Sequence, residues 1–280
     1  MNRFSAIALV LLAATSANAA EKKLDRTFTV SAGGSLTVDA DSASVKVSGA
    51  ETNQVIVHMS ARGADKDLAD MTFEAVQSGN GVNVTLRRRE KGGWFSWRSW
   101  NSEERVEVTV PRRYTINVRT GGGGIELRDT IGSATLKTSG GDIAAKNLDG
   151  TIELRTSGGA ILADTIRGDV DADTSGGDVR LLRIDGKIRG NTSGGSVECS
   201  LVGANREIVA TTSGGDIELI LPRATTGNLD AATSGGDITA DLPILAAVRK
   251  EDRLEGSLNG GGATIRARTS GGSIRLRAAD

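Results

Sequence analysis

The sequence contains very few of the residues on which most folds and active sites depend. Its 280 residues include one cysteine, one histidine, three prolines and only 3% aromatic residues. The single cysteine, Cys199, excludes an internal disulfide, and a histidine-based metal site or a Ser-His-Asp triad would have to rest on His58 alone. We interpret Cys199 as a small buried apolar residue and His58 as an outward residue on a strand. Because aromatic residues are so sparse, we expect an aliphatic, repeated core.

The chain also lacks a long apolar run after its first 20 residues, and neither charge sign dominates. Residues 1–19 have the parts of a secretory signal peptide, namely Arg3, the apolar run Ala6–Ala14 and the small-residue site Ala17-Asn18-Ala19. The apolar run is too short to span a bilayer. Cleavage would remove one of the 34 basic residues and leave 33 facing 35 acidic ones. We therefore expect an exported protein, periplasmic or on the cell surface, without a transmembrane segment or a nucleic-acid partner.

What the sequence does contain is a repeat. A six-residue motif, most often Thr-Ser-Gly-Gly-Asp-Ile, occurs eight times, and its first five copies are spaced 18 residues apart. The copies begin at Thr120, Thr138, Thr156, Thr174, Thr192, Thr212, Thr233 and Thr269. Apolar and polar residues alternate between the motifs, which indicates short strands with one buried face. This pattern predicts an all-β fold, a parallel β-solenoid of the β-helix or β-roll kind with rungs of about 18 residues. An antiparallel meander is the alternative.

The motif itself predicts the turns between the strands. Glycine tolerates positive φ and close backbone approach, and aspartate accepts hydrogen bonds from free backbone N–H groups at a turn. We also expect the stacked threonines to bond one another between rungs. The structural turn residues predicted in this way are Gly140, Gly141, Asp142, Gly158, Gly159, Gly176, Gly177, Asp178, Gly194, Gly195, Gly214, Gly215, Asp216, Gly235, Gly236 and Asp237.

Two other roles for the aspartates are weaker. A broken ladder of single aspartates supplies too few oxygens for calcium. Asp142 and Asp178 would lie two rungs apart, about 9–10 Å, which is near the upper end for the carboxylate pair of an inverting glycosidase. A polysaccharide-active enzyme that uses the aspartates on one solenoid face is therefore the alternative function, although it rests on analogy with other solenoids.

The flanking regions are less regular. Residues 20–118 contain several alternating segments, and we expect them to cap the solenoid of residues 119–280 or to form its wider first coils. The excursion between Asp241 and Leu258 is expected to be a loop or a cap.

One segment, Lys91–Trp100, gathers all three tryptophans beside arginines. We expect it to be a hairpin tip that contacts an envelope protein, a glycan or an anionic membrane surface. Alternatively, its rings cover the open end of the solenoid. The candidate contact residues are Trp94, Phe95, Trp97, Arg98 and Trp100.

Several motifs together resemble a known family. They are Gly33-Gly-Ser-Leu-Thr-Val38, Ser44-Val-Lys-Val-Ser-Gly49, Val108-Thr-Val-Pro111, Thr115-Ile-Asn-Val118 and the serial Thr-Ser-Gly-Gly-Asp-Ile blocks. This pattern is similar to the bacterial "putative adhesin" β-strand-repeat family, a domain of unknown function in envelope and secreted proteins. The resemblance covers nearly the whole mature chain, and no catalytic residues are established for the family.

These observations favour an exported, non-catalytic β-solenoid that acts as a binding or structural module of the cell envelope. We expect no catalytic residues, no cofactor and no metal site.

Overall fold

The computed structural model describes residues 20–89 and 102–279, which form two large, mostly parallel β-sheets. In the order of pairing, sheet A consists of β1 (Ala20–Thr29), β4 (Gln54–Gly63), β7 (Glu103–Pro111), β3 (Ser44–Ala50), β9 (Ile125–Arg128), β11 (Ile143–Asp149), β13 (Ile161–Arg167), β15 (Val179–Asp185), β17 (Val197–Leu201), β19 (Ile217–Leu221), β25 (Ile274–Ala278) and β21 (Ile238–Ala240). Sheet B consists of β22 (Ile244–Arg249), β23 (Arg253–Leu258), β20 (Gly227–Ala232), β24 (Thr264–Arg268), β18 (Ile208–Thr211), β16 (Ile188–Asn191), β14 (Val170–Asp173), β12 (Ile152–Arg155), β10 (Ala134–Lys137), β8 (Tyr114–Thr120), β2 (Gly34–Ala40), β6 (Gly81–Arg88) and β5 (Met71–Ser78).

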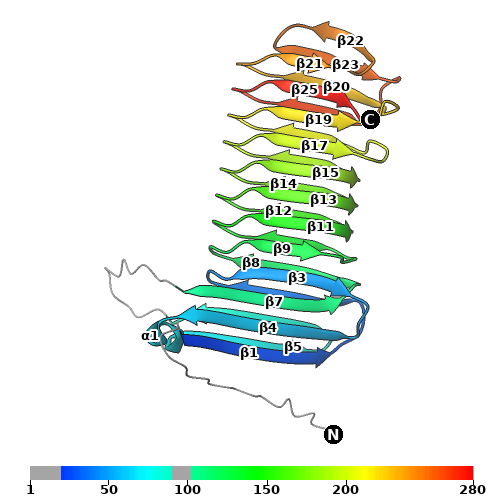
Figure 1. Cartoon of the computed structure of the whole chain (residues 1–280). Coiled ribbons are helices and arrows are strands. Elements are labelled where there is room, and N and C mark those ends of the chain that lie inside the picture. The colour runs from blue at the N-terminus through cyan, green and yellow to red at the C-terminus, as the bar shows by residue number, and fades with distance from the viewer. Residues whose placement is uncertain (1–19, 90–101, 280) are drawn as a thin grey trace.

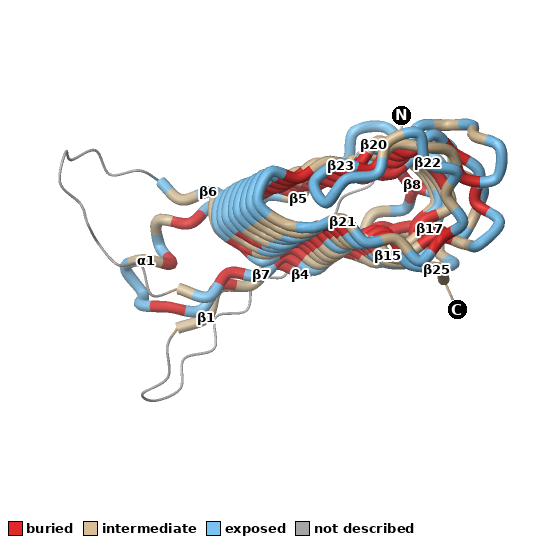
Figure 2. The backbone as a smooth tube through the Cα atoms, turned by 90° about the horizontal axis from the view of Figure 1, so that it is seen from above, coloured by how far each residue is buried: buried red, intermediate tan, exposed pale blue. Residues whose placement is uncertain are grey.

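The two sheets stand face to face along a tall stack, and the buried residues lie between them (Figures 1 and 2). The chain passes back and forth between the sheets, so that one strand of each sheet and the turn between them make a rung. Parallel pairing sets like residues on one another, as where Ile143 lies between Ile125 and Ile161. This register turns each apolar position into a continuous buried column. The predicted all-β class with stacked, mostly parallel strands is confirmed.

The core is aliphatic, as the composition indicates. One cluster of buried residues runs from Val30 to Leu276, through the N-terminal region and the repeats alike. Cys199 is fully buried in the column of Leu181 and Leu219, and burial, with a smaller contribution from Glu198, raises the pKa of its thiol to about 12. It is therefore an apolar core residue, as expected.

The order of the rungs along the stack departs from the order of the chain at both ends. The first rung, β2 and β3, lies between the rung of β6 and β7 and that of β8 and β9. The last rung, β24 and β25, lies between the rung of β18 and β19 and that of β20 and β21. The first and last rungs of the chain therefore lie inside the stack, although β1 itself is the outermost strand of sheet A.

Antiparallel strands close the stack. At the N-terminal end β4 pairs antiparallel with β7 and with β1, and β5 pairs antiparallel with β6. The only helix among the described residues, α1 (Asp65–Ala69), connects β4 to β5. At the other end the excursion 241–258 forms β22 and β23, which extend sheet B beyond β20. This excursion, expected to be a loop or a cap, is thus an antiparallel strand pair at the end of sheet B.

The predicted hairpin tip at residues 91–100 lies outside the described residues. The strands on either side, β6 and β7, do not pair with each other, because β6 lies in sheet B and β7 in sheet A. The candidate contact residues of this segment, Trp94, Phe95, Trp97, Arg98 and Trp100, also lie outside the described residues. In the part of the chain that is described, no helix has the length and apolar composition needed to cross a membrane.

Candidate binding face on sheet A

The repeated turn is held together by its threonine. Thr156 Oγ1 donates a hydrogen bond to the carbonyl oxygen of Gly141 on the neighbouring rung at 2.9 Å and accepts one from the N–H of Gly159 at 3.3 Å. All eight motif threonines are buried. Seven of them donate to a glycine carbonyl and Thr120 donates to the carbonyl of Ala43, so the expected ladder of mutually bonded hydroxyls is wrong. Their burial removes them from any binding surface.

The second glycine of each motif permits this close stacking. A Cβ on Gly159 would lie 2.1 Å from the carbonyl oxygen of Gly141, whereas a Cβ on the first glycine, Gly158, would lie 3.5 Å from that of Gly140. A side chain at the second position would therefore push the rungs apart. The turn thus presents its exposed side chains at regular spacing.

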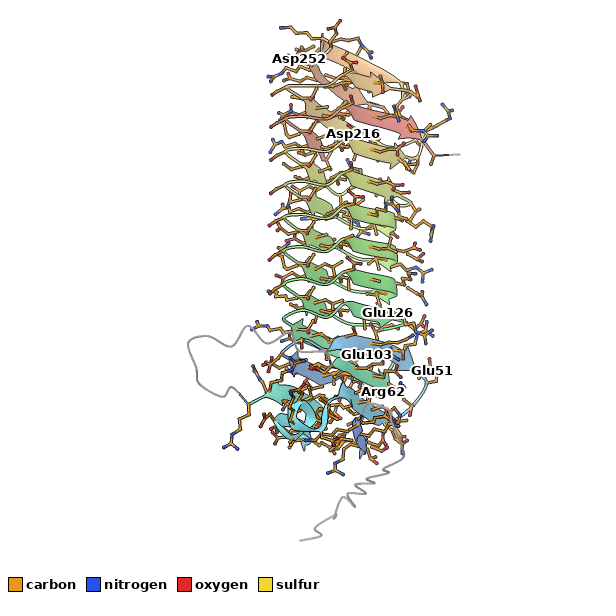
Figure 3. The ribbon with its side chains drawn as sticks, turned by 60° about the vertical axis from the view of Figure 1, so that its left-hand side comes forward. Glu51, Arg62, Glu103, Glu126, Asp216 and Asp252 are labelled. Atoms are coloured by element: carbon orange, nitrogen blue, oxygen red, sulfur yellow. The ribbon has the colours of Figure 1, made fainter. Side chains whose placement is uncertain are left out.

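The aspartates at the end of the turn link successive rungs. Asp142 Oδ1 accepts a hydrogen bond from the N–H of Ala160 at 2.8 Å, and Asp178 Oδ1 accepts one from Ser196 at 2.8 Å. Asp216 Oδ1 accepts the N–H of Ser273, on the inserted last rung, at 2.7 Å. The bond thus goes to the next rung, while the carboxylates themselves remain at the surface. Figure 3 shows Asp216 and Glu126 at different heights on the outside of the stack.

Beside this aspartate column, the outer face of sheet A is hollowed. One hollow, of ≈ 340 Å³, runs across the rungs from β15 to β21. Five carboxylates and two guanidinium groups line it. Its lining residues are Asp178, Arg180, Ser196, Val197, Glu198, Asp216, Ile217, Glu218, Asp237, Thr239, Ser273 and Arg275. A second hollow of ≈ 410 Å³ lies on the same face nearer the N-terminal end. It is lined by Ser44, Val45, Lys46, Arg105, Glu107, Gly124, Ile125, Glu126, Asp142 and Ala144.

The first hollow carries an excess of negative charge. Arg180 lies 3.7 Å from Glu198, and Arg277, beside the hollow, donates to Glu218 at 3.0 Å. Glu198 and Glu218 are direct partners on β17 and β19, so their side chains leave the sheet about one strand spacing apart. Within residues 20–89 and 102–279, no ion pair neutralises Asp178, Asp216 or Asp237. This surface therefore offers hydrogen-bond acceptors in a line along the stack.

Sequence reasoning identified only one side of this hollow. It singled out Asp178, Asp216 and Asp237, but it missed Glu198 and Glu218 on the adjoining strands. These glutamates follow the turn by two residues, at the first outward position of the strand, and this regular offset was the signal for them. The glycines and aspartates between Gly140 and Asp237 that the sequence predicted as turn residues all lie along one corner of the stack. They form only one edge of the hollowed face.

Metal and histidine chemistry find little support on this face. The described ranges contain no group of three or more histidine, cysteine, aspartate or glutamate side chains placed to hold a metal ion. His58 projects from the exposed side of β4, where its Nδ1 lies 2.6 Å from Asp25 Oδ1 on β1. It is an outward residue on a strand, as expected, and lies at the N-terminal end, several strands from the first hollow.

The stacked parallel sheets, the repeated turn and the hollowed outer face define a β-repeat protein of the solenoid-like class. The family described as Toastrack DUF4097 matches residues 34–277, and the chain belongs to this family. The match confirms the family resemblance of the sequence motifs. No curated protein sequence matches the chain.

Several solved structures are similar over most of their length. A "putative adhesin" from Parabacteroides distasonis has 10% identity and a TM-score of 0.38, over 91% of this chain and 97% of that one. A "putative adhesin" from Bacteroides fragilis has 12% identity and a TM-score of 0.31, over the same shares. A "putative lipid binding protein" from Parabacteroides distasonis has 11% identity and a TM-score of 0.34, over 91% and 96%. At these TM-scores the likenesses carry no argument about the ligand of this chain.

Proposed function

We propose that this chain is an exported, non-catalytic binding module of the cell envelope that holds an elongated ligand along the outer face of sheet A. The observation that carries the proposal is the hollow across β15 to β21, whose polar side chains repeat from rung to rung. A surface that repeats along one axis suits a ligand that also repeats along one axis. The signal-like residues 1–19 support export.

The charge of the hollow indicates the chemistry of the ligand. Carboxylates without a cationic neighbour accept hydrogen bonds from hydroxyl and ammonium groups, which glycan chains present in series. The same carboxylates repel an anionic membrane surface. We therefore propose a glycan, in preference to a lipid surface, as the ligand of this face.

A non-catalytic role suits this face because its aspartates already accept hydrogen bonds from backbone N–H groups. Asp142, Asp178 and Asp216 each use one oxygen to accept a backbone N–H of the next rung. All three side chains are exposed at the corner, where no apolar pocket surrounds the carboxyl group. The alternative of a polysaccharide-active enzyme therefore has no supporting geometry of its own.

The test uses calorimetry to measure the binding of glucosamine oligomers and of neutral N-acetylglucosamine oligomers to residues 20–280. We expect the double variant Asp216→Asn, Asp237→Asn, which removes two carboxylates without an ion-pair partner among the described residues, to weaken binding about 10-fold, equivalent to about 1.4 kcal/mol. The matched control is Glu153→Gln, which removes a half-exposed carboxylate from the outer face of sheet B. Vesicles with anionic lipid serve as the comparison ligand.

Four outcomes would contradict the proposal. Absence of glycan binding, or equal loss in Glu153→Gln, removes the face from the function. Binding of the vesicles in place of the glycans would replace the ligand class. Release of new reducing ends from the oligomers, lost when Asp178 and Asp216 are changed to Asn, would make the protein an enzyme.

A further inference from the structure

The C-terminal end of sheet B finishes in a strand that is exposed and almost free of charge. β22 pairs with β23 on one side, and its other edge has no partner strand among the described residues. Its only charged residue is Arg249, at its end. Leu245 is 80% exposed, more than any other large apolar side chain in the described ranges. A free, apolar strand edge is a template for pairing with another strand.

β22 has one irregularity, a register shift between Ala246 and Val248 in its pairing with β23, but no charged side chain before Arg249. The edges at the N-terminal end carry charged and amide side chains that bond across to the other sheet. Lys22, on the inward row of β1, donates from Nζ to the carbonyl oxygen of Met71 on β5 at 2.5 Å. Gln77 Nε2 on β5 donates to the carbonyl oxygen of Thr29 on β1 at 2.9 Å. These bonds join the last strands of the two sheets, and inward-pointing cations are a device that blocks edge pairing. The two ends therefore differ in their capacity to accept a further strand.

We propose that β22 pairs antiparallel with β22 of a second copy of this chain, so that two stacks join at their C-terminal ends about a two-fold axis. The same strand meets itself in such a contact. Antiparallel self-pairing of β22 sets apolar residues of Ile244–Val248 opposite one another, and the two Arg249 side chains lie at opposite ends of the contact. The partner strand lies beside Leu245. Each copy uses its one free β22 edge in the contact, so the assembly contains two copies and no more.

Self-pairing of β1 in the same manner is unfavourable. When β1 pairs with itself about Leu24, Lys22 of each copy lies opposite Arg26 of the other on the half-buried inward row. The same register sets Lys23 opposite Asp25, but on the exposed outward row, where solvent weakens their attraction. Like charges directly opposite on neighbouring strands are destabilising. The N-terminal end therefore stays single, and association stops at the dimer instead of continuing into a fibre.

The dimer is expected to be weak and reversible. One pair of six-residue edges buries less than the roughly 1,000 Å² of a stable interface, and main-chain hydrogen bonds supply much of its affinity. The contact involves the end of sheet B, so the hollow on the outer face of sheet A stays open in both copies. The proposal is independent of the ligand proposed for that hollow.

The experiment is sedimentation velocity on residues 20–280 from about 2 to about 200 µM, where an interface of this size would dissociate. We expect the mean mass to rise towards that of a dimer. Leu245→Lys should raise the midpoint concentration at least about 10-fold. The matched control is Val76→Lys, since Val76 is the exposed large apolar residue on β5, the edge of sheet B at the N-terminal end. Both variants should keep the melting temperature of the wild type.

A cysteine placed at Ala246, which faces itself across the proposed two-fold axis, gives a second readout. Because Cys199 is fully buried, Ala246→Cys provides the one accessible thiol in the described part of the chain. We expect mild oxidation to give a covalent dimer with Ala246→Cys and none with Val76→Cys. A wild type that stays monomeric throughout the concentration range, or a dimer that Leu245→Lys leaves intact, would overturn the proposal. So would a dimer that Val76→Lys dissociates.

Discussion

The middle of the stack and its C-terminal end use the same turn but differ in the order of their rungs. From β10 to β17 each rung follows the previous one in sequence and in space, whereas the last rung, β24 and β25, lies inside the stack. The contacts of the turn are nevertheless alike. Thr156 donates to Gly141 at 2.9 Å in the middle, and Thr269 donates to Gly215 at 2.8 Å on the inserted rung. Local chemistry therefore specifies how two rungs meet, and something else must specify which rungs meet.

The aspartate column supplies a physical reason for the order. Along the stack its residues read Asp142, Ala160, Asp178, Ser196, Asp216, Ser273 and Asp237, so acidic and uncharged residues alternate. In chain order Asp216 would lie beside Asp237, about 4.8 Å away, where two unit charges repel by about 1 kcal/mol even in a water-like dielectric. The inserted rung places Ser273 between them. Charge alternation therefore favours the observed order over the simple one.

The largest predicted effect tests whether the two regions are stacked equally tightly. Gly159→Ala should lower the free energy of unfolding by more than about 3 kcal/mol, because its Cβ would lie 2.1 Å from the Gly141 carbonyl oxygen. Gly158→Ala, one residue away with 3.5 Å of space, should cost about 1 kcal/mol or less. Urea unfolding of both variants measures the difference.

The same pair of changes on the inserted rung extends the test. A Cβ on Gly272 would lie 2.1 Å from the carbonyl oxygen of Gly215, and one on Gly271 would lie 3.1 Å from that of Gly214. We expect Gly272→Ala to release the last rung, seen as hydrogen exchange of Ile274–Ala278. Equal losses for the first and second glycines in either region would disprove this account of the turn.

A smaller effect is predicted for the charge alternation. Ser273→Asp would place three aspartates on adjacent rungs and should destabilise the protein by about 1–2 kcal/mol at pH 7. Ser273→Asn retains a hydrogen-bond acceptor without the charge and should cost less. Mutual repulsion raises the pKa of each carboxyl in the folded state, so the penalty of the aspartate variant should fade as the pH drops and the carboxyls take up protons. A penalty that is independent of pH would refute the electrostatic reading.

The sequence was sufficient to predict the stacked strands but not the rung order. A fixed period fixes the columns, since Ile125, Ile143 and Ile161 must stack if each rung repeats the last. The period alone does not predict that the rung of β24 and β25, which follows the β22–β23 hairpin in sequence, lies inside the stack. The signal available was the alternation itself, because Asp216 followed by Asp237 breaks it and Ser273 restores it.

A third prediction concerns the attachment of the inserted rung to β20. Asp230 accepts a hydrogen bond from Arg268 on β24, and Arg266 lies 3.5 Å away. Burial alone would raise the pKa of Asp230, but the hydrogen bond and the charges of these arginines outweigh it and hold the pKa below its usual value. Asp230→Asn should therefore destabilise the protein by about 1 kcal/mol at pH 7.

The pH dependence of Asp230→Asn follows from the direction of the shift. A carboxyl with a lowered folded-state pKa stabilises the protein above its unfolded pKa, and this contribution is lost as the pH falls through the folded value. The difference from wild type should thus shrink in acid. Asp241 is exposed at the same end of the stack, so Asp241→Asn should leave the free energy of unfolding nearly unchanged both at pH 7 and in acid. If Asp230→Asn and Asp241→Asn lose the same free energy of unfolding, the ion pair of Asp230 does not stabilise the protein.

The smallest effect is a predicted gain in the middle of the stack, where the aspartate column has a gap. Ser196 Oγ accepts the N–H of Asp216 at 3.2 Å, and Ser273 Oγ accepts that of Asp237 at 3.3 Å, but Ala160 has no side-chain acceptor for the N–H of Asp178. Ala160→Ser should complete the series and stabilise the protein by about 0.5–1 kcal/mol. Ser196→Ala should lose a similar amount, with both changes measured by urea unfolding. If Ser196→Ala destabilises and Ala160→Ser adds nothing, the middle rungs do not depend on this bond as the C-terminal rungs do, and the two regions differ in local chemistry as well as in order.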